Sequence, residues 1–201
     1  MTGVQKMAEV VLFHHVQGLT EGVLAFADEL RTGGHTVHTP DLFEGERPPS
    51  IEEGVAYARG LGDEVAARAD RAVAGLPAGL VFGGFSMGAA EAQRLAQTRP
   101  GALGALLYES CFPLTGDWAF GPWPDGVRVQ VHGMDQDPFF ALEGDLDNAR
   151  ELVEVVGPEL AALFVYPGDR HLFTDSSLAS YDAEATALVL QRSRELLAAV
   201  D

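Results

Sequence analysis

The stretch "VFGGFSMGAAEAQRLAQTRP", residues 81–100, changes character abruptly at Ser86. An apolar run ends at two glycines, the serine follows with a further glycine two positions on, and an alanine-rich segment then begins. The apolar run predicts a buried strand, and the alanine-rich segment predicts a helix that stops at Pro100. The chain must therefore change direction sharply at Ser86, so this serine is either a turn residue or a nucleophile.

The rest of the chain repeats this alternation of apolar runs and segments of helical period. Strands are predicted over residues 9–15, 35–41, 78–85, 101–109, 127–133 and 161–168. Helices are predicted over residues 20–34, 51–73, 87–99, 146–156 and 182–200, with a break possible at Gly60 or Gly62. Almost wholly apolar strands that alternate with helices are typical of a mainly parallel sheet covered on both faces. The sequence therefore predicts an α/β fold, formed as a single domain over residues 1–201.

The composition indicates which kinds of partner and which cellular location to expect. Of the 201 residues, 47% are hydrophobic and 21% are charged, and the formal net charge is −17. This charge argues against nucleic acid or an anionic membrane as partner, because either needs a basic patch. The single cysteine, Cys111, excludes an internal disulfide and is interpreted as a buried packing residue. The first 15 residues are too short and too polar for a signal peptide or spanning helix, so a cytoplasmic location is expected.

The pattern G-x-S-x-G at residues 84–88 is typical of a nucleophile placed on a tight strand-to-helix turn. Side chains two positions before and after such a residue would crowd it, which explains the glycines. The helix that begins there directs N–H groups and the positive end of its dipole at the site. A glycine-rich turn that happens to contain a serine is the alternative, but the strand and helix on either side favour a nucleophile.

A serine nucleophile needs a base, and the base needs an orienting acid. His171 follows the last predicted strand, and Asp135 and Asp137 follow the strand before it. The carboxyl ends of parallel strands meet at one edge, where ligands bind in such sheets. His171 is therefore the predicted base and Asp137 the predicted acid, with Asp135 as an alternative and Glu109, after another strand, as a third candidate.

Acyl transfer also requires two donors for the oxyanion. The N–H of Met87, directly after the nucleophile, is one candidate, and the N–H of Val16, in the loop after the first strand, is the other. The adjacent His14 and His15 could instead suggest metal ligands. Neighbouring side chains on a strand point to opposite faces, however, so no metal site is expected there. No cofactor is expected either.

The segments that contain these residues together resemble the dienelactone hydrolase family of α/β-hydrolases. The resemblance runs nearly end to end, through "VVLFHHVQGLT", "GHTVHTPDLFEG", "GGFSMGA", "VQVHGMDQDPFF" and "YPGDRHLFTD". It implies a compact α/β-hydrolase fold with helices on both faces of the sheet and no large lid domain. It also implies the roles assigned above: Ser86 as nucleophile, Asp137 as acid, His171 as base, and Val16 and Met87 as oxyanion donors.

The sequence departs from the family at positions that bear on substrate. The name-giving members use a cysteine nucleophile and a glutamate in the loop after the first strand, whereas Ser86 and His15 hold those positions here. The arginines that hold the carboxylate of a dienelactone have no clear counterparts, and Arg47 and Arg170 match them poorly. The resemblance therefore favours ester or lactone hydrolysis in general over hydrolysis of dienelactone itself.

Residues 110–126, "SCFPLTGDWAFGPWPDG", follow a predicted strand and should overhang the same edge of the sheet. Their aromatic side chains either form an apolar pocket wall or pin a proline-rich loop to the core, and the sequence leaves both readings open. The predicted substrate-binding residues are His15, Phe112, Trp118, Trp123 and Phe139.

Three functions fit these features. The first is a serine hydrolase that cleaves a small carboxylic ester, lactone or thioester through an acyl-enzyme. The second is an acyltransferase on the same scaffold, and the third is a non-catalytic binding domain that kept the fold. A nucleophile, an acid and a base in this chain order, each at a strand end, favour the hydrolase. The sequence leaves the oligomeric state open.

Overall fold

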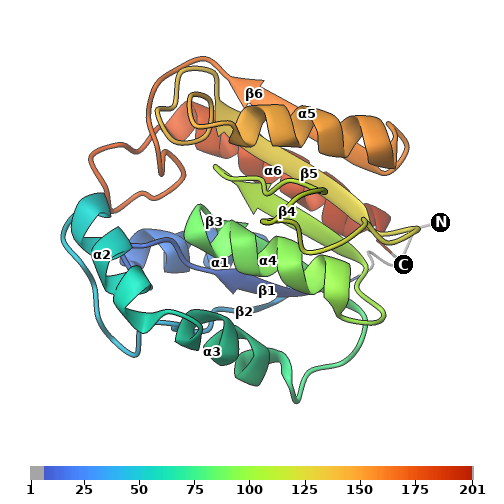
Figure 1. Ribbon diagram of the computed structural model, residues 1–201, viewed down its shortest axis with the longest axis horizontal. Coiled ribbons are helices and arrows are strands. Elements are labelled where there is room, and N and C mark those ends of the chain that lie inside the picture. The colour runs from blue at the N-terminus through green and yellow to red at the C-terminus, as the bar shows by residue number, and fades with distance from the viewer. Residues whose placement is uncertain (1–6, 201) are drawn as a thin grey trace.

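The computed structural model describes residues 7–200, and a six-stranded parallel sheet forms its centre (Figure 1). The strands are β1 (Glu9–Phe13), β2 (Thr36–His38), β3 (Leu80–Phe85), β4 (Gly104–Tyr108), β5 (Arg128–Met134) and β6 (Ala161–Tyr166). Their order is β2-β1-β3-β4-β5-β6, and every neighbouring pair is parallel. The chain moves outward from β1 to β2 and then returns to place β3 on the other side of β1. Ligands bind at such a switch point, beyond the carboxyl ends of the strands.

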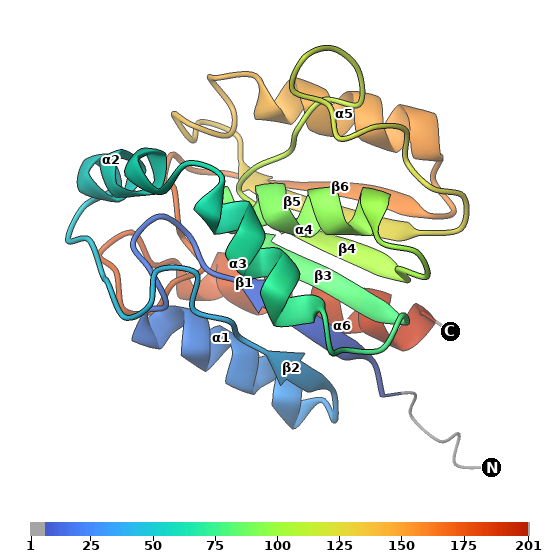
Figure 2. The same cartoon turned by 60° about the horizontal axis from the view of Figure 1, so that its bottom comes forward.

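Six helices cover the sheet of the described chain on both faces (Figure 2). They are α1 (Glu21–Thr32), α2 (Ile51–Leu61), α3 (Glu64–Val73), α4 (Met87–Thr98), α5 (Asp145–Val156) and α6 (Ala183–Ala199). Apolar side chains of α1 and α6 pack into one core on one face, and those of α3, α4 and α5 pack into a second core on the other. The predicted α/β fold is confirmed, and the part of the chain that the structure describes holds no additional domain.

The boundaries of several elements differ from those predicted. The helix predicted over residues 51–73 is divided into α2 and α3 at Gly62, whose φ of 56° lies in a region that favours glycine. Strand β2 stops at His38, because Pro40 has no N–H to donate to a ladder. The carboxylate of Asp41 then accepts bonds from the N–H groups of Phe43 and Gly45, at 2.9 and 2.7 Å, and forms a turn.

The start of α4 lies unusually close to the sheet. A Cβ atom on Gly84 would overlap the carbonyl oxygen of Gly88, and one on Gly88 would lie 2.5 Å from the carbonyl oxygen of Phe13. Only residues without side chains allow α4 to begin directly against β1 and β3. The turn that carries Ser86 is thereby pressed against the end of β1.

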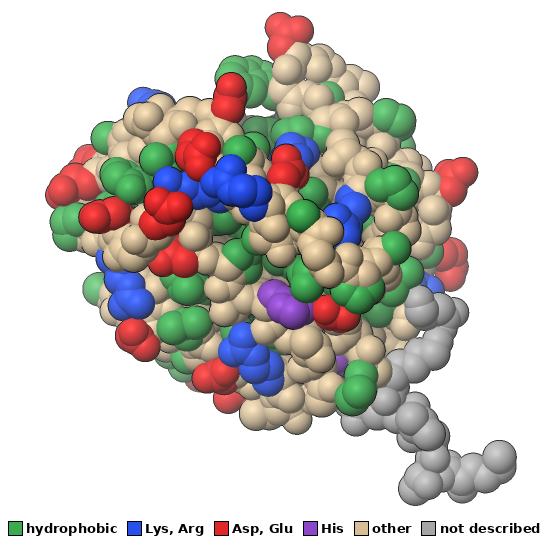
Figure 3. All heavy atoms as spheres, turned by 90° about the horizontal axis from the view of Figure 1, so that it is seen from below, with side chains coloured by type: hydrophobic (Ala, Val, Ile, Leu, Met, Phe, Trp, Pro, Cys, Tyr) green, Lys and Arg blue, Asp and Glu red, His purple; other side chains and the backbone are tan. Residues whose placement is uncertain are grey.

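Acidic and basic side chains are interspersed on the face of the molecule drawn in Figure 3. Around α3, Arg68 pairs with Glu44 at 2.9 Å, and Arg71 pairs with Glu64 at 2.6 Å. The acidic partners in both pairs are exposed, and ion pairs at a surface contribute little to stability. Within residues 7–200, none of the helices combines the length and apolarity needed to cross a bilayer.

Candidate active site

Ser86 occupies a strained turn between β3 and α4. Its φ is 50° and its ψ is −113°, a conformation that non-glycine residues adopt rarely and usually at functional sites. Its main-chain N–H donates to the carbonyl of Tyr108 at 2.8 Å, which ties the turn to β4. Although Ser86 immediately precedes α4, its hydroxyl does not cap the helix. The hydroxyl is therefore available to another partner.

That partner is His171. The distance from Ser86 Oγ to His171 Nε2 is 2.9 Å, and the distance from His171 Nδ1 to Asp137 Oδ2 is 2.7 Å. The second oxygen of Asp137 accepts the main-chain N–H groups of Phe139 and Phe140, at 2.9 and 3.2 Å. Because an ionised carboxylate only accepts, Nδ1 carries the proton and Nε2 is left to accept the serine hydroxyl.

The structure distinguishes among the three carboxyl groups considered for the acid. Asp137 is fully buried and hydrogen-bonds to His171. Asp135 is exposed and instead accepts the N–H of Gly168 at 2.9 Å, which holds the loop after β6. Glu109 is buried but bonds to Thr174 and not to the imidazole. Only Asp137 is placed to orient the ring.

The surroundings of His171 favour its protonated form. Burial alone would lower the pKa of His171. The hydrogen bond to Asp137 and the negative charge of nearby carboxylates outweigh burial, so the pKa of His171 lies above the ordinary value of 6.5. These carboxylates are Glu109, Asp137 and Asp145. The site is thus arranged to stabilise a positive charge on the imidazole.

The two N–H groups predicted to bind an oxyanion lie in segments held close to the turn. Met87 follows Ser86 directly, and Val16 lies in the loop after β1. The carbonyls of Phe13 and His14, just before Val16, lie close to Gly88. Gly54 of α2 packs so closely on the Val16 carbonyl that a Cβ there would overlap it. Within the described chain, neither the Val16 nor the Met87 N–H donates to a protein acceptor.

The sequence matches the model of the Dienelactone hydrolase family over residues 2–200. The chain belongs to the dienelactone hydrolase family. A search of curated proteins finds no match.

Solved structures share the fold of this family member at low sequence identity. The protein named m3DLH is 21% identical, with a TM-score of 0.73, over 99% of this chain and 89% of its own. A dienelactone hydrolase-like promiscuous phosphotriesterase from metagenomic libraries is 17% identical, with a TM-score of 0.74, over 98% and 88% of the two chains. Thermogutta terrifontis esterase 2, phosphonylated by cyclosarin, is 14% identical, with a TM-score of 0.61, over 96% and 83%. These likenesses show an α/β-hydrolase fold.

His15, at the position that resembles the family's glutamate, is buried and takes part in a network that sequence reasoning missed. Its Nε2 donates to Asp175 Oδ2 at 2.8 Å, and its Nδ1 accepts the N–H of Gln17 at 3.1 Å. The hydroxyl of Thr20 also donates to Asp175, and so do the N–H and hydroxyl of Ser177. The network joins the Val16 loop to the loop that carries His171, which favours a structural role for His15 over contact with substrate.

His14 is held in one tautomer beneath the same loop. Its Nδ1 donates to the carbonyl of His15 at 2.7 Å, and its Nε2 accepts the N–H of Leu42 at 2.9 Å. Burial lowers the pKa of His14 to about 4, so the ring stays neutral at ordinary pH. Neither histidine has a nitrogen left for a metal, and residues 7–200 hold no cluster of three or more potential metal ligands.

The predicted aromatic residues have different environments. Phe139 is 37% exposed, and its ring centroid lies 4.7 Å from that of His171, so it lies beside the base. Trp123 donates its indole N–H to the carbonyl of Val127 at 2.9 Å and packs on the core, as expected of a residue that pins the loop. The rings of Phe112 and Phe120 are tilted against each other, with centroids 5.3 Å apart and 37° between their planes, and Trp118 is 76% exposed.

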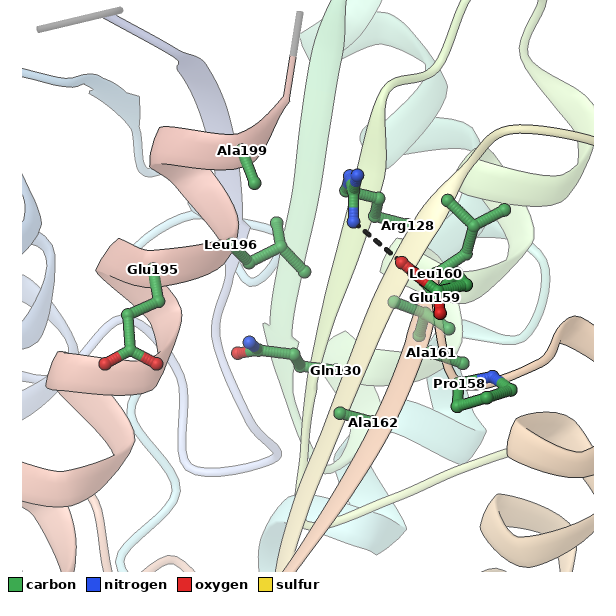
Figure 4. Close-up of a pocket in the computed structure, with 11 residues that line it drawn as sticks. Arg128, Gln130, Pro158, Glu159, Leu160, Ala161, Ala162, Glu195, Leu196 and Ala199 are labelled. Carbon is green, nitrogen blue, oxygen red and sulfur yellow. Dashed lines mark hydrogen bonds between the residues drawn. The ribbon is translucent and has the colours of Figure 1, made fainter.

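A separate hollow of about 190 Å³ lies at the opposite end of the sheet (Figure 4). It is lined by the first residues of β5 and β6, among them Arg128 and Gln130, and by Glu195 and Leu196 of α6. No histidine, serine or cysteine among residues 7–200 lines it, whereas the Ser86 turn lies at the carboxyl ends of the strands. The hollow therefore lacks the groups that acyl-transfer chemistry requires.

Replacing Asp175 with asparagine should destabilise the fold in a pH-dependent manner. Burial alone would raise the pKa of this carboxyl, but hydrogen bonds from His15, Ser177 and Thr20 outweigh burial and lower it from 3.8 to about 2. The stabilisation is therefore present above about pH 4 and is lost as the pH falls toward 2. We expect Asp175→Asn to lower the free energy of unfolding by about 2 kcal/mol at pH 7. Urea unfolding at pH 7, 5, 3.5 and 2.5 should show the same deficit at pH 7 and 5 and a shrinking deficit below about pH 4.

The exposed carboxylate of Asp28 provides the control. Asp28→Asn should change the free energy of unfolding by less than about 0.5 kcal/mol at every pH. A deficit in Asp175→Asn that stays constant from pH 7 to 2.5 would contradict the assignment of the stabilisation to the ionised carboxylate.

Proposed function

We propose that the protein is a serine hydrolase that cleaves small carboxylic esters, lactones or thioesters through an acyl-enzyme. The observation that carries this proposal is the continuous chain of hydrogen bonds from Ser86 Oγ to His171 Nε2, at 2.9 Å, and from His171 Nδ1 to Asp137 Oδ2, at 2.7 Å. Membership of the dienelactone hydrolase family supports it. The cytoplasmic location and the single-domain organisation over residues 1–201 stay predictions.

In the first half-reaction, Ser86 Oγ attacks the carbonyl carbon of the substrate. His171 Nε2 accepts the hydroxyl proton as the new C–O bond forms, and Asp137 stabilises the imidazolium and holds its ring. The tetrahedral intermediate then collapses, the bond to the leaving group breaks, and His171 returns its proton to the departing oxygen or sulfur. The acyl group remains on Ser86.

In the second half-reaction, water replaces the leaving group. His171 Nε2 takes a proton from the water as its oxygen attacks the acyl carbon, and the second tetrahedral intermediate releases the acid and restores the Ser86 hydroxyl. Met87 and Val16 are proposed to donate their main-chain N–H groups to the oxyanion in both steps. The positive end of the α4 dipole adds to this stabilisation.

The charges around the site indicate the class of substrate. His171 is surrounded by carboxyl groups, and no arginine or lysine within residues 7–200 hydrogen-bonds to the triad. Arg47 pairs with Glu21 at 3.1 Å, and Arg170 donates to the carbonyl of Tyr181 at 3.0 Å. We propose that the substrate carries no carboxylate close to the scissile bond.

A phosphonate probe tests the nucleophile directly. We expect a fluorescent fluorophosphonate to label the wild-type protein at one site and to leave Ser86→Ala unlabelled, because the probe reacts with an activated serine. Esterase 2 from Thermogutta terrifontis, which shares the fold, has been obtained phosphonylated by cyclosarin. Gel fluorescence and intact mass give the measurement. Absence of labelling in wild type, or labelling that persists in Ser86→Ala, would remove the hydrolase proposal.

A pair of esters of similar size tests the substrate class. We expect kcat/KM for 4-nitrophenyl butyrate to exceed that for the 4-nitrophenyl monoester of succinate by about tenfold or more, because the succinate carboxylate would approach like charges. The comparison is made at pH 8 and low salt, with the spontaneous rates subtracted. Equal values, or a preference for the succinate ester, would contradict the proposed class.

A further inference from the structure

Glu109 is a buried charged residue next to the triad that the mechanism above does not use. It follows β4 directly and is 1% exposed. Its φ of 63° is uncommon for a residue with a side chain, and its main-chain N–H donates to the carbonyl of His132 at 2.7 Å. The surrounding structure therefore holds Glu109 in an unfavourable conformation at the end of the sheet where Ser86 lies.

The hydrogen bonds of the Glu109 carboxyl connect it to the loop that carries the base. Oε1 accepts the hydroxyl of Thr174 at 3.2 Å and lies 3.4 Å from the main-chain nitrogen of Thr174. Thr174 is three residues beyond His171. The other oxygen, Oε2, is buried and has no hydrogen-bond partner in the described chain. A buried carboxyl oxygen without a protein partner lowers stability, so Glu109 is placed at a cost to the fold.

The charged groups around Glu109 are those of the site. The imidazole of His171 attracts its negative form, and the carboxylate of Asp137 repels it. Asp145, on α5, also acts on His171, but its Oδ2 accepts the hydroxyl of Ser110 at 2.6 Å and the N–H of Cys111 at 3.1 Å. Burial raises the pKa of Glu109 to about 7. Its negative charge is therefore gained or lost near neutral pH.

We propose that Glu109 is a positioning residue that acts through His171, as a second buried carboxylate that stabilises the imidazolium formed when Ser86 attacks. This inference rests on the proposed hydrolase function. Glu109 exchanges no proton with the substrate: the proton moves from Ser86 to His171 and then to the leaving group. Asp137 orients the ring through its hydrogen bond, and Glu109 adds negative charge and holds the loop through Thr174.

The isosteric change Glu109→Gln removes the charge and keeps a carbonyl oxygen that can accept from Thr174. We expect the pKa of His171, read by NMR of the imidazole in a Ser86→Ala background, to fall by about 0.5–1 unit in Ser86→Ala/Glu109→Gln. Glu109→Asp keeps the charge and should leave the pKa closer to that of the Ser86→Ala protein. Asp145→Asn is the matched control. It should lower the pKa of His171 by less than Glu109→Gln does, because the Asp145 carboxylate accepts hydrogen bonds from Ser110 and Cys111. An unchanged or raised His171 pKa in the glutamine variant would overturn the proposal.

The pH dependence of ester turnover is a second measurement, and it distinguishes the proposed role of Glu109 from a purely structural one. With Ser86 present, Glu109→Gln should move the acid limb of the kcat/KM profile to lower pH by a similar amount. It should also lower the plateau of kcat about three- to tenfold with little change in KM. A fall of about 0.5–1 unit in the pKa of His171 corresponds to this loss of rate, because the imidazolium also forms in the transition state. A uniform loss of activity with an unmoved acid limb would indicate a structural role and overturn the proposal.

A reciprocal measurement covers the case in which Glu109→Gln fails to fold. In Ser86→Ala/His171→Gln, the pKa of Glu109, read by carbon NMR of its carboxyl, should rise above its value in Ser86→Ala, because the favourable imidazolium is lost. An unchanged pKa would overturn the proposal. These titrations test the role of Glu109 without measuring turnover. Phosphonate labelling tests the hydrolase proposal separately, so failure of one proposal can be distinguished from failure of the other.

Discussion

The contact between the start of α4 and the ends of β1 and β3 is the constraint on which the site depends. With no side chain at Gly84 or Gly88, the helix begins directly against the carbonyl of Phe13, and Ser86 is forced to a positive φ of 50°. This strained conformation turns the hydroxyl away from the helix it precedes and toward His171. Close packing of main chain against main chain thus stores the strain and fixes the position of the hydroxyl that we propose as the nucleophile.

The remaining groups are arranged around the hydrogen bond between Ser86 and His171. Asp137 is fixed by two main-chain N–H groups and holds the ring of His171, while the carboxyls of Glu109 and Asp145 act on the ring without bonding to it. Burial alone would disfavour the imidazolium, and the surrounding negative charge reverses this preference. The same surroundings are the reason for proposing a substrate without a carboxylate near the scissile bond, and the net charge of −17 agrees with that proposal.

Much of this arrangement could be predicted from the sequence, because it depends on local patterns and on topology. Apolar runs that alternate with helical segments predict the parallel sheet, and G-x-S-x-G between a strand and a helix predicts the turn at Ser86. Asp137 is the predicted acid, but the sequence leaves Asp135 as an alternative because both residues follow β5. Their different hydrogen bonds, to the N–H of Phe139 and to that of Gly168, depend on loop geometry that the sequence pattern does not specify. The partner of His15, Asp175, was missed because the two residues are 160 positions apart and meet only through tertiary packing.

The central claim is that Ser86, His171 and Asp137 work as one unit, with Asp137 and not its neighbour as the acid. The most direct test is ester turnover by Asp137→Asn and Asp135→Asn, two substitutions of the same chemistry two residues apart, with circular dichroism to verify the fold of both. We expect Asp137→Asn to lower kcat by about 10⁴-fold, because the amide favours the wrong tautomer of His171, and Asp135→Asn to stay within about threefold of wild type. Equal losses, or a larger loss in Asp135→Asn, would contradict the account.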